Sequence, residues 1–188
     1  MDKNRHKDIR YLRMARVWSE NSYAIRLKVG ALIVSKEGNI ISDGYNGTPS
    51  GFENVCEIAS DKQYEPFAHL SDEAKRDTLK KQLTLGNITL ITKPYVLHAE
   101  ANALTKLARS TQSSVGATLY VTDMPCMECS KLIIQAGIRR VVYERPYRIT
   151  DGIALLQRAG IEVVNIPTKV IDEETKLAEQ ARNYEADE

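Results

Sequence analysis

Residues 117–144 read ATLYVTDMPCMECSKLIIQAGIRRVVYE and contain three segments of regular structure. Residues 117–122 are mostly apolar and include β-branched and aromatic side chains, which predicts a strand. A helix is predicted from Cys126 to Gly137, because glycine is typical just past a helix C-terminus. Residues 139–144 predict a second strand. This strand–helix–strand unit indicates a layered α/β fold.

The alternation of strands and helices continues on both sides of that unit. Upstream, residues 29–35 and 40–45 predict a β-hairpin, and residues 98–110 predict a helix. Downstream, the sequence predicts a helix over 152–160, a strand over 161–167 and a charged helix from Asp172. Near the N-terminus an amphipathic helix is predicted from the i, i+3, i+4, i+7 spacing of Tyr11, Met14, Ala15 and Trp18. The length of 188 residues fits a single domain.

Residues 53–94 interrupt this pattern and are interpreted as a polar insertion into the single domain spanning 1–188. The stretch has few large apolar residues and no clean strand pattern. Residues 72–83 (DEAKRDTLKKQL) predict a solvated helix inside it. Cys56 and His69 also lie there. A structural metal site would need two more ligands nearby, so a buried thiol and a surface imidazole are favoured.

Composition argues against some functional classes. Lys and Arg total 26 against 25 Asp and Glu, which gives a net charge of +1. A protein that holds nucleic acid mainly by charge is expected to be more basic. Residues 1–10 are polar, unlike a secretory signal, and no window is apolar enough for a membrane span. We therefore expect a cytoplasmic protein whose cysteines stay reduced.

Cys126 and Cys129 have the spacing of a metal or redox pair at a helix start. Positions three apart on a helix share a face, so both sulfurs can point at one centre. That spacing alone leaves structural metal, redox and catalytic roles open. His98 would add a nitrogen ligand, and three protein ligands leave the fourth zinc position for water, as in catalytic sites. Glu100 is the candidate proton acceptor, although residues two apart on an ideal helix point in nearly opposite directions.

The combination of His98-Ala99-Glu100 with Pro125-Cys126-Met127-Glu128-Cys129 is the signature of zinc-dependent nucleobase deaminases. GYNGTP (44–49), HAEANAL (98–104), ATLYVT (117–122) and AGIRRVVY (136–143) resemble the deoxycytidylate deaminases in particular. The resemblance implies a three-layer cytidine-deaminase-like fold, with a central mixed sheet of about five strands flanked by helices. It further implies hydrolysis of dCMP to dUMP and ammonia. His98, Cys126 and Cys129 would bind Zn²⁺, and Glu100 would transfer protons.

The same resemblance implies substrate contacts, with solvated or core roles as alternatives. The Ala99 backbone N–H would meet the pyrimidine carbonyl, Asn46 the sugar, and Arg26 the phosphate. Arg26 could equally be a solvated surface residue, and Tyr120 could be a core residue. The expected substrate residues are Arg26, Asn46, Thr48, Ala99, Tyr120 and Tyr147.

Members of the family are often hexameric, activated by dCTP with Mg²⁺ and inhibited by dTTP. By resemblance, the regulatory nucleotide would bind Gly44, Tyr45, Asn46, Gly47 and Arg109, although Arg109 could simply be a helix C-terminal cation. We expect a homo-oligomer whose partners are the small nucleotides dCMP, dCTP and dTTP.

Two other functions remain open from the sequence. The first is a deaminase acting on a base within nucleic acid, such as a tRNA adenosine or a single-stranded DNA cytidine. Net charge and the lack of a basic, aromatic-rich stretch disfavour it. The second is a non-catalytic zinc-binding module, which would have no use for Glu100.

Overall fold

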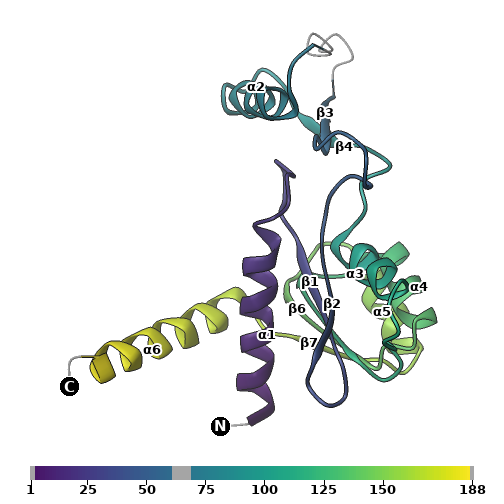
Figure 1. Cartoon of the computed structure of the whole chain (residues 1–188), viewed down its shortest axis with the longest axis vertical. Helices are drawn as coiled ribbons and strands as arrows, with labels where there is room; N and C mark the ends of the chain where they lie inside the picture. The colour runs from purple at the N-terminus through teal and green to yellow at the C-terminus, as the bar shows by residue number, and fades with distance from the viewer. Residues whose placement is uncertain (1–2, 61–68, 187–188) are drawn as a thin grey trace.

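The computed structural model of the chain describes residues 3–60 and 69–186, so residues 61–68 of the predicted insertion lie outside it. Over these ranges it contains six helices and two β-sheets (Figure 1). The helices are α1 (Lys3–Ser19), α2 (Asp72–Thr84), α3 (Ala99–Leu107), α4 (Met127–Gln135), α5 (Asp151–Arg158) and α6 (Thr168–Ala186). The strands are β1 (Gly30–Val34), β2 (Ile40–Tyr45), β3 (Glu57–Ala59), β4 (Leu90–Thr92), β5 (Thr118–Asp123), β6 (Arg140–Arg145) and β7 (Glu162–Asn165).

The larger sheet has the strand order β2-β1-β5-β6-β7 and is mixed. β1 runs antiparallel to both β2 and β5, whereas β5, β6 and β7 are parallel. Parallel neighbours require crossover connections, and α4 and α5 supply them. The predicted mixed sheet of about five strands is therefore confirmed.

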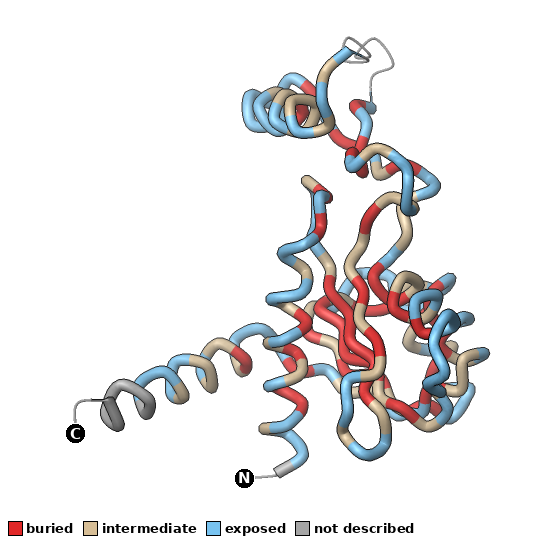
Figure 2. Tube along the Cα trace, in the orientation of Figure 1, coloured by how far each residue is buried: buried red, intermediate tan, exposed pale blue. Residues whose placement is uncertain are grey.

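Helices cover both faces of this sheet, which makes three layers. One core joins the sheet to α3, α4 and α5 through residues such as Ala103, Ile133 and Leu156. A second core on the opposite face joins it to α1 and the first turn of α6, with Leu12 and Ile171 fully buried. Figure 2 shows the buried residues concentrated along the sheet, while the later turns of α6 extend away from it.

Two helices begin earlier than the sequence predicted. α1 starts at Lys3, two turns before Tyr11, and its added residues Asp8 and Ile9 are buried. α6 starts at Thr168, directly after Pro167, rather than at Asp172. Proline is tolerated next to a helix start, because the first N–H groups have no intrahelical acceptor. The structure describes no helix that is both long and apolar enough to cross a bilayer.

The insertion is more ordered than its composition indicated. The expectation that it holds no strand is wrong: β3 and β4 pair in antiparallel register. Each has three residues, which is too short for alternation to be recognised in the sequence. The predicted helix is confirmed as α2, capped by Ser71. The insertion has its own small core, which consists of Val55, Ala59, Leu79, Ile88 and Leu90.

Candidate active site

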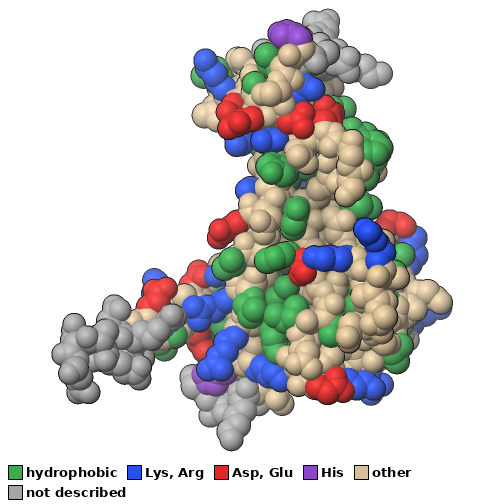
Figure 3. All heavy atoms as spheres, viewed as in Figure 1, with side chains coloured by type: hydrophobic (Ala, Val, Ile, Leu, Met, Phe, Trp, Pro, Cys, Tyr) green, Lys and Arg blue, Asp and Glu red, His purple; other side chains and the backbone are tan. Residues whose placement is uncertain are grey.

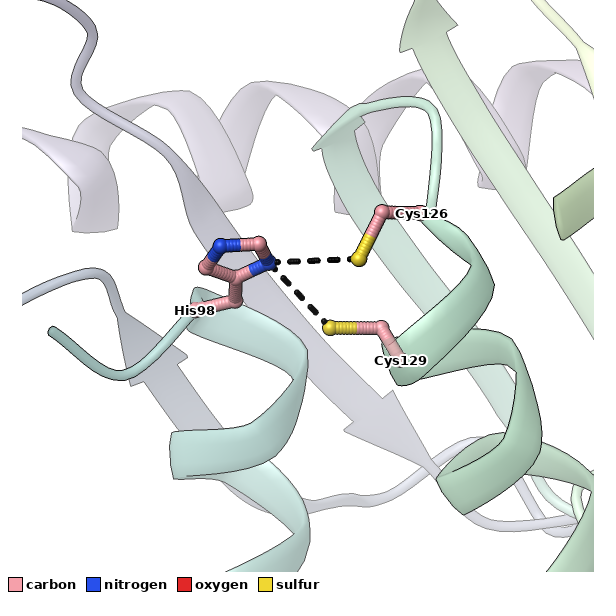
Figure 4. A group of neighbouring side chains, drawn as sticks. All are labelled: His98, Cys126 and Cys129. Atoms are coloured by element: carbon pink, nitrogen blue, oxygen red, sulfur yellow. Dashed lines mark hydrogen bonds between the residues drawn. The ribbon is translucent and has the colours of Figure 1, made fainter. Parts of the chain in front are cut away.

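The three predicted metal ligands meet at the N-termini of two neighbouring helices. His98 is the N-cap of α3 and Cys126 is the N-cap of α4, while Cys129 lies in the first turn of α4. The His98 Nδ1 atom is 3.4 Å from each cysteine Sγ (Figure 4). All three candidate ligand atoms lie within 4.8 Å of one another.

The start of α3 explains how His98 and Glu100 serve one site. His98 has an extended backbone, with φ −74° and ψ 157°, so it lies outside the helical spacing. Glu100 is the second residue of the helix and is 4% exposed. The helix therefore begins between the two residues, and the opposite directions expected on an ideal helix do not apply.

A close approach between β2 and α3 holds this helix start in place. At Gly44 an added Cβ would lie 2.3 Å from the Ala99 carbonyl oxygen and 2.5 Å from the Ala103 nitrogen. Just beyond β2, Gly47 and Leu97 exchange two backbone hydrogen bonds of 3.0 and 2.8 Å. These contacts fix the backbone that leads into His98.

Hydrogen bonds among the three ligands and the burial of Glu100 set the local electrostatics. Hydrogen bonds from Cys129 and His98 lower the pKa of Cys126 to about 3. The contact with Cys126, together with burial, raises the pKa of the Cys129 thiol, and the same cysteine raises the pKa of His98. Burial raises the pKa of Glu100 to about 7. A carboxyl group with such a pKa can accept and release protons near neutrality.

The donor set fits a zinc ion. One imidazole nitrogen and two sulfurs are preferred zinc ligands. Among the described residues, no fourth histidine, cysteine or carboxylate ligand atom joins the group. The arrangement therefore resembles a three-ligand catalytic site more than a four-ligand structural one.

A cavity of about 510 Å³ opens beside this group. Most of the residues predicted to contact zinc or substrate line it. They are Arg26, Asn46, His98, Ala99, Glu100, Cys126 and Tyr147.

Two of these residues, Asn46 and Arg26, form hydrogen bonds within the cavity wall. The Asn46 amide donates to the Leu27 carbonyl at 2.8 Å and accepts from the Val29 N–H at 2.8 Å. It therefore holds the loop that precedes β1. The Arg26 guanidinium is exposed and donates to the Thr92 hydroxyl at 3.1 Å. Tyr147 is 61% exposed.

Two predicted substrate residues are not brought to the cavity. Tyr120 faces the opposite core, is 4% exposed, and donates to Asp8 at 2.8 Å. The pocket-wall interpretation is thus corrected in favour of the core alternative. Thr48 donates to the Glu53 carbonyl at 2.8 Å and braces its own loop.

The residues expected to bind a regulatory nucleotide lie on β2 and the loop beyond it, except for Arg109. Gly44 is buried against α3, and the Tyr45 carbonyl accepts from Asn102. Arg109 is exposed, two residues beyond the end of α3. Cys56 is buried and His69 is exposed, as expected for a structural thiol and a surface imidazole.

Sequence reasoning missed Glu57, Thr92 and Asp123, which also line the cavity. Asp123 is paired with Arg145 across two neighbouring parallel strands. Glu57 is an acidic residue between apolar neighbours in NVCEIA (54–59), and it is 1% exposed. An acidic residue inside an apolar run was the available signal for a buried functional carboxylate.

The fold and the site define a class of α/β proteins in which two helix N-termini bring three candidate metal ligands beside a buried acid. The model of the family described as the cytidine and deoxycytidylate deaminase zinc-binding region matches residues 5–145. The chain belongs to this family, which confirms the resemblance seen in its motifs.

Individual relatives agree with the family match. The deoxycytidylate deaminase of Enterobacteria phage T4 is 35% identical over 173 residues, covering 84% of this chain and 89% of that protein. The human deoxycytidylate deaminase is 35% identical over 116 residues, covering 62% of this chain and 52% of the human protein. Among solved structures, a dCMP deaminase from cyanophage S-TIM5 in complex with dCMP and dUMP is 39% identical. Its TM-score is 0.66, with 88% of this chain and 99% of that one covered.

Proposed function

We propose that this protein is a zinc-dependent hydrolase that converts dCMP to dUMP and ammonia. The observation that carries the proposal is that a single cavity is lined by the candidate metal ligands His98 and Cys126, by the buried Glu100 and by the cationic Arg26. This set suits a ligand with a reactive base at one end and a phosphate at the other. The names of the phage and cyanophage relatives support the same substrate.

Each residue has a role that follows from its position. Glu100 takes a proton from the attacking water and passes it to the departing amino nitrogen, for which a pKa near neutrality is suited. Ala99 is the first residue of α3, so its N–H has no acceptor within the helix and can bind the pyrimidine carbonyl. Held by His98, Cys126 and Cys129, a zinc ion would supply a Lewis acid that makes water a better nucleophile.

The remaining contacts select the nucleotide. Arg26 binds the phosphate through charge-assisted hydrogen bonds. Asn46 keeps the loop bearing Arg26 against the sugar, and Tyr147 covers the base from its exposed position after β6.

The experiment is a deamination assay that compares dCMP, deoxycytidine, dCTP and tRNA. We expect dCMP to have by far the highest kcat/KM. Equal rates on dCMP and deoxycytidine would reject the phosphate role of Arg26. Deamination confined to tRNA would instead reject the mononucleotide substrate.

Regulation is a separate part of the proposal. dCTP with Mg²⁺ activates and dTTP inhibits, through Gly44, Tyr45, Asn46, Gly47 and Arg109 in an oligomer. The support is the GYNGTP motif, which leads directly into the loop beside the cavity. Turnover measured with each nucleotide added would test it, and no response to either would reject it.

A further inference from the structure

Glu57 is a buried carboxylate in the wall of the cavity that the proposed chemistry does not use. It is the first residue of β3, it is 1% exposed, and it lines the cavity. Its partner across the two-stranded sheet is Thr92, which lines the same cavity. Directly opposed residues of an antiparallel pair place their side chains on one face, so Glu57 and Thr92 form one patch of the wall.

The two carboxylate oxygens of Glu57 differ in their surroundings. Oε1 accepts the backbone N–H groups of Ile25 at 3.0 Å and of Arg26 at 3.1 Å. Oε2 is buried and has no hydrogen-bond partner among the described residues. An unsatisfied buried acceptor is costly, and a charged one more so. A ligand that enters the cavity and donates a hydrogen bond to Oε2 would remove that cost.

The position of Glu57 indicates which part of a nucleotide would donate. Arg26 forms hydrogen bonds with both members of the Glu57–Thr92 pair. Its backbone N–H donates to Glu57 and its guanidinium donates to Thr92. The phosphate site is therefore adjacent to Glu57, whereas Glu100 and the metal ligands define the base site. The sugar of a bound nucleotide must lie between these sites.

Among the groups of a deoxynucleotide near that point, only one can donate to a carboxylate. An ionised phosphate has no proton to donate and would be repelled, whereas the sugar of dCMP carries a free 3′-hydroxyl group. The Asn46 amide already has a backbone partner on both its oxygen and its nitrogen, whereas Glu57 Oε2 is buried without a partner among the described residues, so Glu57 gains more from a donor.

We infer that Glu57 Oε2 accepts a hydrogen bond from the 3′-hydroxyl of the bound nucleotide and thereby restricts the site to free mononucleotides. This inference rests on the proposed function. A nucleotide within a polynucleotide chain has a 3′-phosphodiester, which lacks the donor and brings a negative charge next to Glu57. The carboxylate thus both binds the correct ligand and rejects a base embedded in nucleic acid.

The test compares dCMP, 2′,3′-dideoxy-CMP and dCMP 3′-phosphate on the zinc-loaded wild-type protein. Loss of a hydrogen bond to a charged group should lower kcat/KM for the dideoxy compound by roughly 10- to 100-fold. The 3′-phosphate should be poorer still. Equal kcat/KM for dCMP and its dideoxy analogue would overturn the inference while leaving the proposed function intact. No turnover of dCMP would overturn both.

The variant Glu57→Gln tests whether Glu57 causes the preference for dCMP over the two analogues. The amide oxygen can still accept from Ile25 and Arg26, but an NH₂ group replaces Oε2. We expect the preference for dCMP over the dideoxy analogue to fall, because an amide–hydroxyl hydrogen bond is weaker than one to a carboxylate. The 3′-phosphate should become a better substrate, because the negative charge is removed. Glu73→Gln, an exposed change on α2, should keep the wild-type ratios.

A purely structural role for Glu57 predicts a different result. If the variant only displaced the Arg26 loop, kcat/KM would fall by the same factor for dCMP and for the dideoxy analogue. The ratio of the two kcat/KM values would then stay at the wild-type value. That outcome would overturn the inference. If Glu57→Gln does not fold, the wild-type comparison of the three compounds decides alone.

Discussion

His98 and Glu100 can act on one site because α3 begins between them. The N-cap histidine keeps an extended backbone, and the glutamate occupies the first helical turn, where it is almost fully buried. Burial raises the pKa of Glu100, so the same position that hides the carboxyl from water also suits it to proton transfer. The proposed metal binding and proton transfer would thus fall to different residues of one tripeptide.

Glu100→Gln should separate these two roles. The amide keeps the shape of the side chain but cannot take a proton, so kcat on dCMP should fall by roughly 10²- to 10⁴-fold or more. Zinc content should stay at the wild-type value, because Glu100 is not among the candidate metal ligands. Metal analysis and steady-state kinetics on the same sample would check this.

Changing a ligand provides the matched control. His98→Ala should lose both zinc and activity, and a chelator should do the same to the wild-type protein, with recovery when zinc is restored. An unchanged kcat in Glu100→Gln would reject Glu100 as the proton-transfer residue, whereas a zinc-loaded wild-type protein without turnover would favour a non-catalytic zinc module.

Gly44→Ala should destabilise the fold although it adds only one methyl group. Its Cβ would lie 2.3 Å from the Ala99 carbonyl oxygen, and backbone atoms cannot move aside as a flexible side chain can. We expect a loss of about 1–3 kcal/mol in the free energy of unfolding, as for other overpacked sites. Gly47→Ala is the control, because its nearest atom is 3.9 Å away. Equal denaturation midpoints for the two variants would contradict the prediction.

At the scale of single residues, the sequence predicted features that depend on neighbouring positions well. It predicted features that depend on residues far apart in the sequence poorly. The candidate ligands that the structure brings together could be recognised because their chemistry depends on short spacings, as in PCMEC and HAE. Tyr120 could not be placed, since the face on which a fully buried strand residue points is not encoded by alternation when both faces are covered. Glu57 was missed because its partners, Ile25 and Arg26, lie more than thirty positions away.

Among the elements, the strands and helices of the main sheet followed from apolar runs and terminal glycines. The two strands of the insertion and the ends of α1 and α6 did not. β3 and β4 exist because Val55, Leu79 and Leu90 gather into a small core, which is a tertiary effect that overrides a polar composition. The helix ends are likewise decided by packing, as the burial of Ile9 and Ile171 shows.

Arg16 of α1 connects three elements, so its substitution should strongly lower the stability of the fold. Its guanidinium binds both oxygens of Glu144 on β6, at 2.8 and 2.7 Å, and Asp172 on α6 at 2.6 Å. Glu144 is 1% exposed, so Arg16→Met would leave a buried charge without its main partner. The expected loss is about 3 kcal/mol, at the lower end of the range for buried pairs because Arg16 is partly exposed.

Chemical denaturation of two further variants would test this reasoning. Lys131→Met removes only an exposed pair with Glu128 and should change stability by less than about 0.5 kcal/mol. Adding Glu144→Gln to Arg16→Met should recover part of the loss, because the uncompensated charge is removed. No recovery would show that the arginine acts through packing instead.

At the scale of the whole molecule, the expected homo-oligomer requires an exposed apolar surface that can be buried between subunits. Hydrophobic side chains gather over the face formed by α1 and β2 (Figure 3). Met14, Val17 and Trp18 of α1 are 46%, 61% and 36% exposed, and together with Ile40 of β2 they line one groove. A contiguous apolar surface of this kind favours association, and a second copy of the chain is the partner that the family resemblance implies.

Light scattering would measure that association directly. We expect a mass that is a multiple of 21.1 kDa, with six chains as the specific expectation. Val17→Glu should lower the mass, because a charge in a desolvated interface is costly. Leu85→Glu makes the same kind of change at an equally exposed site, 61% for both residues, outside the groove, and should leave the mass unchanged. A wild-type protein that stays at the mass of one chain at all concentrations would contradict the expectation, and an equal effect of both variants would place the contact elsewhere on the surface.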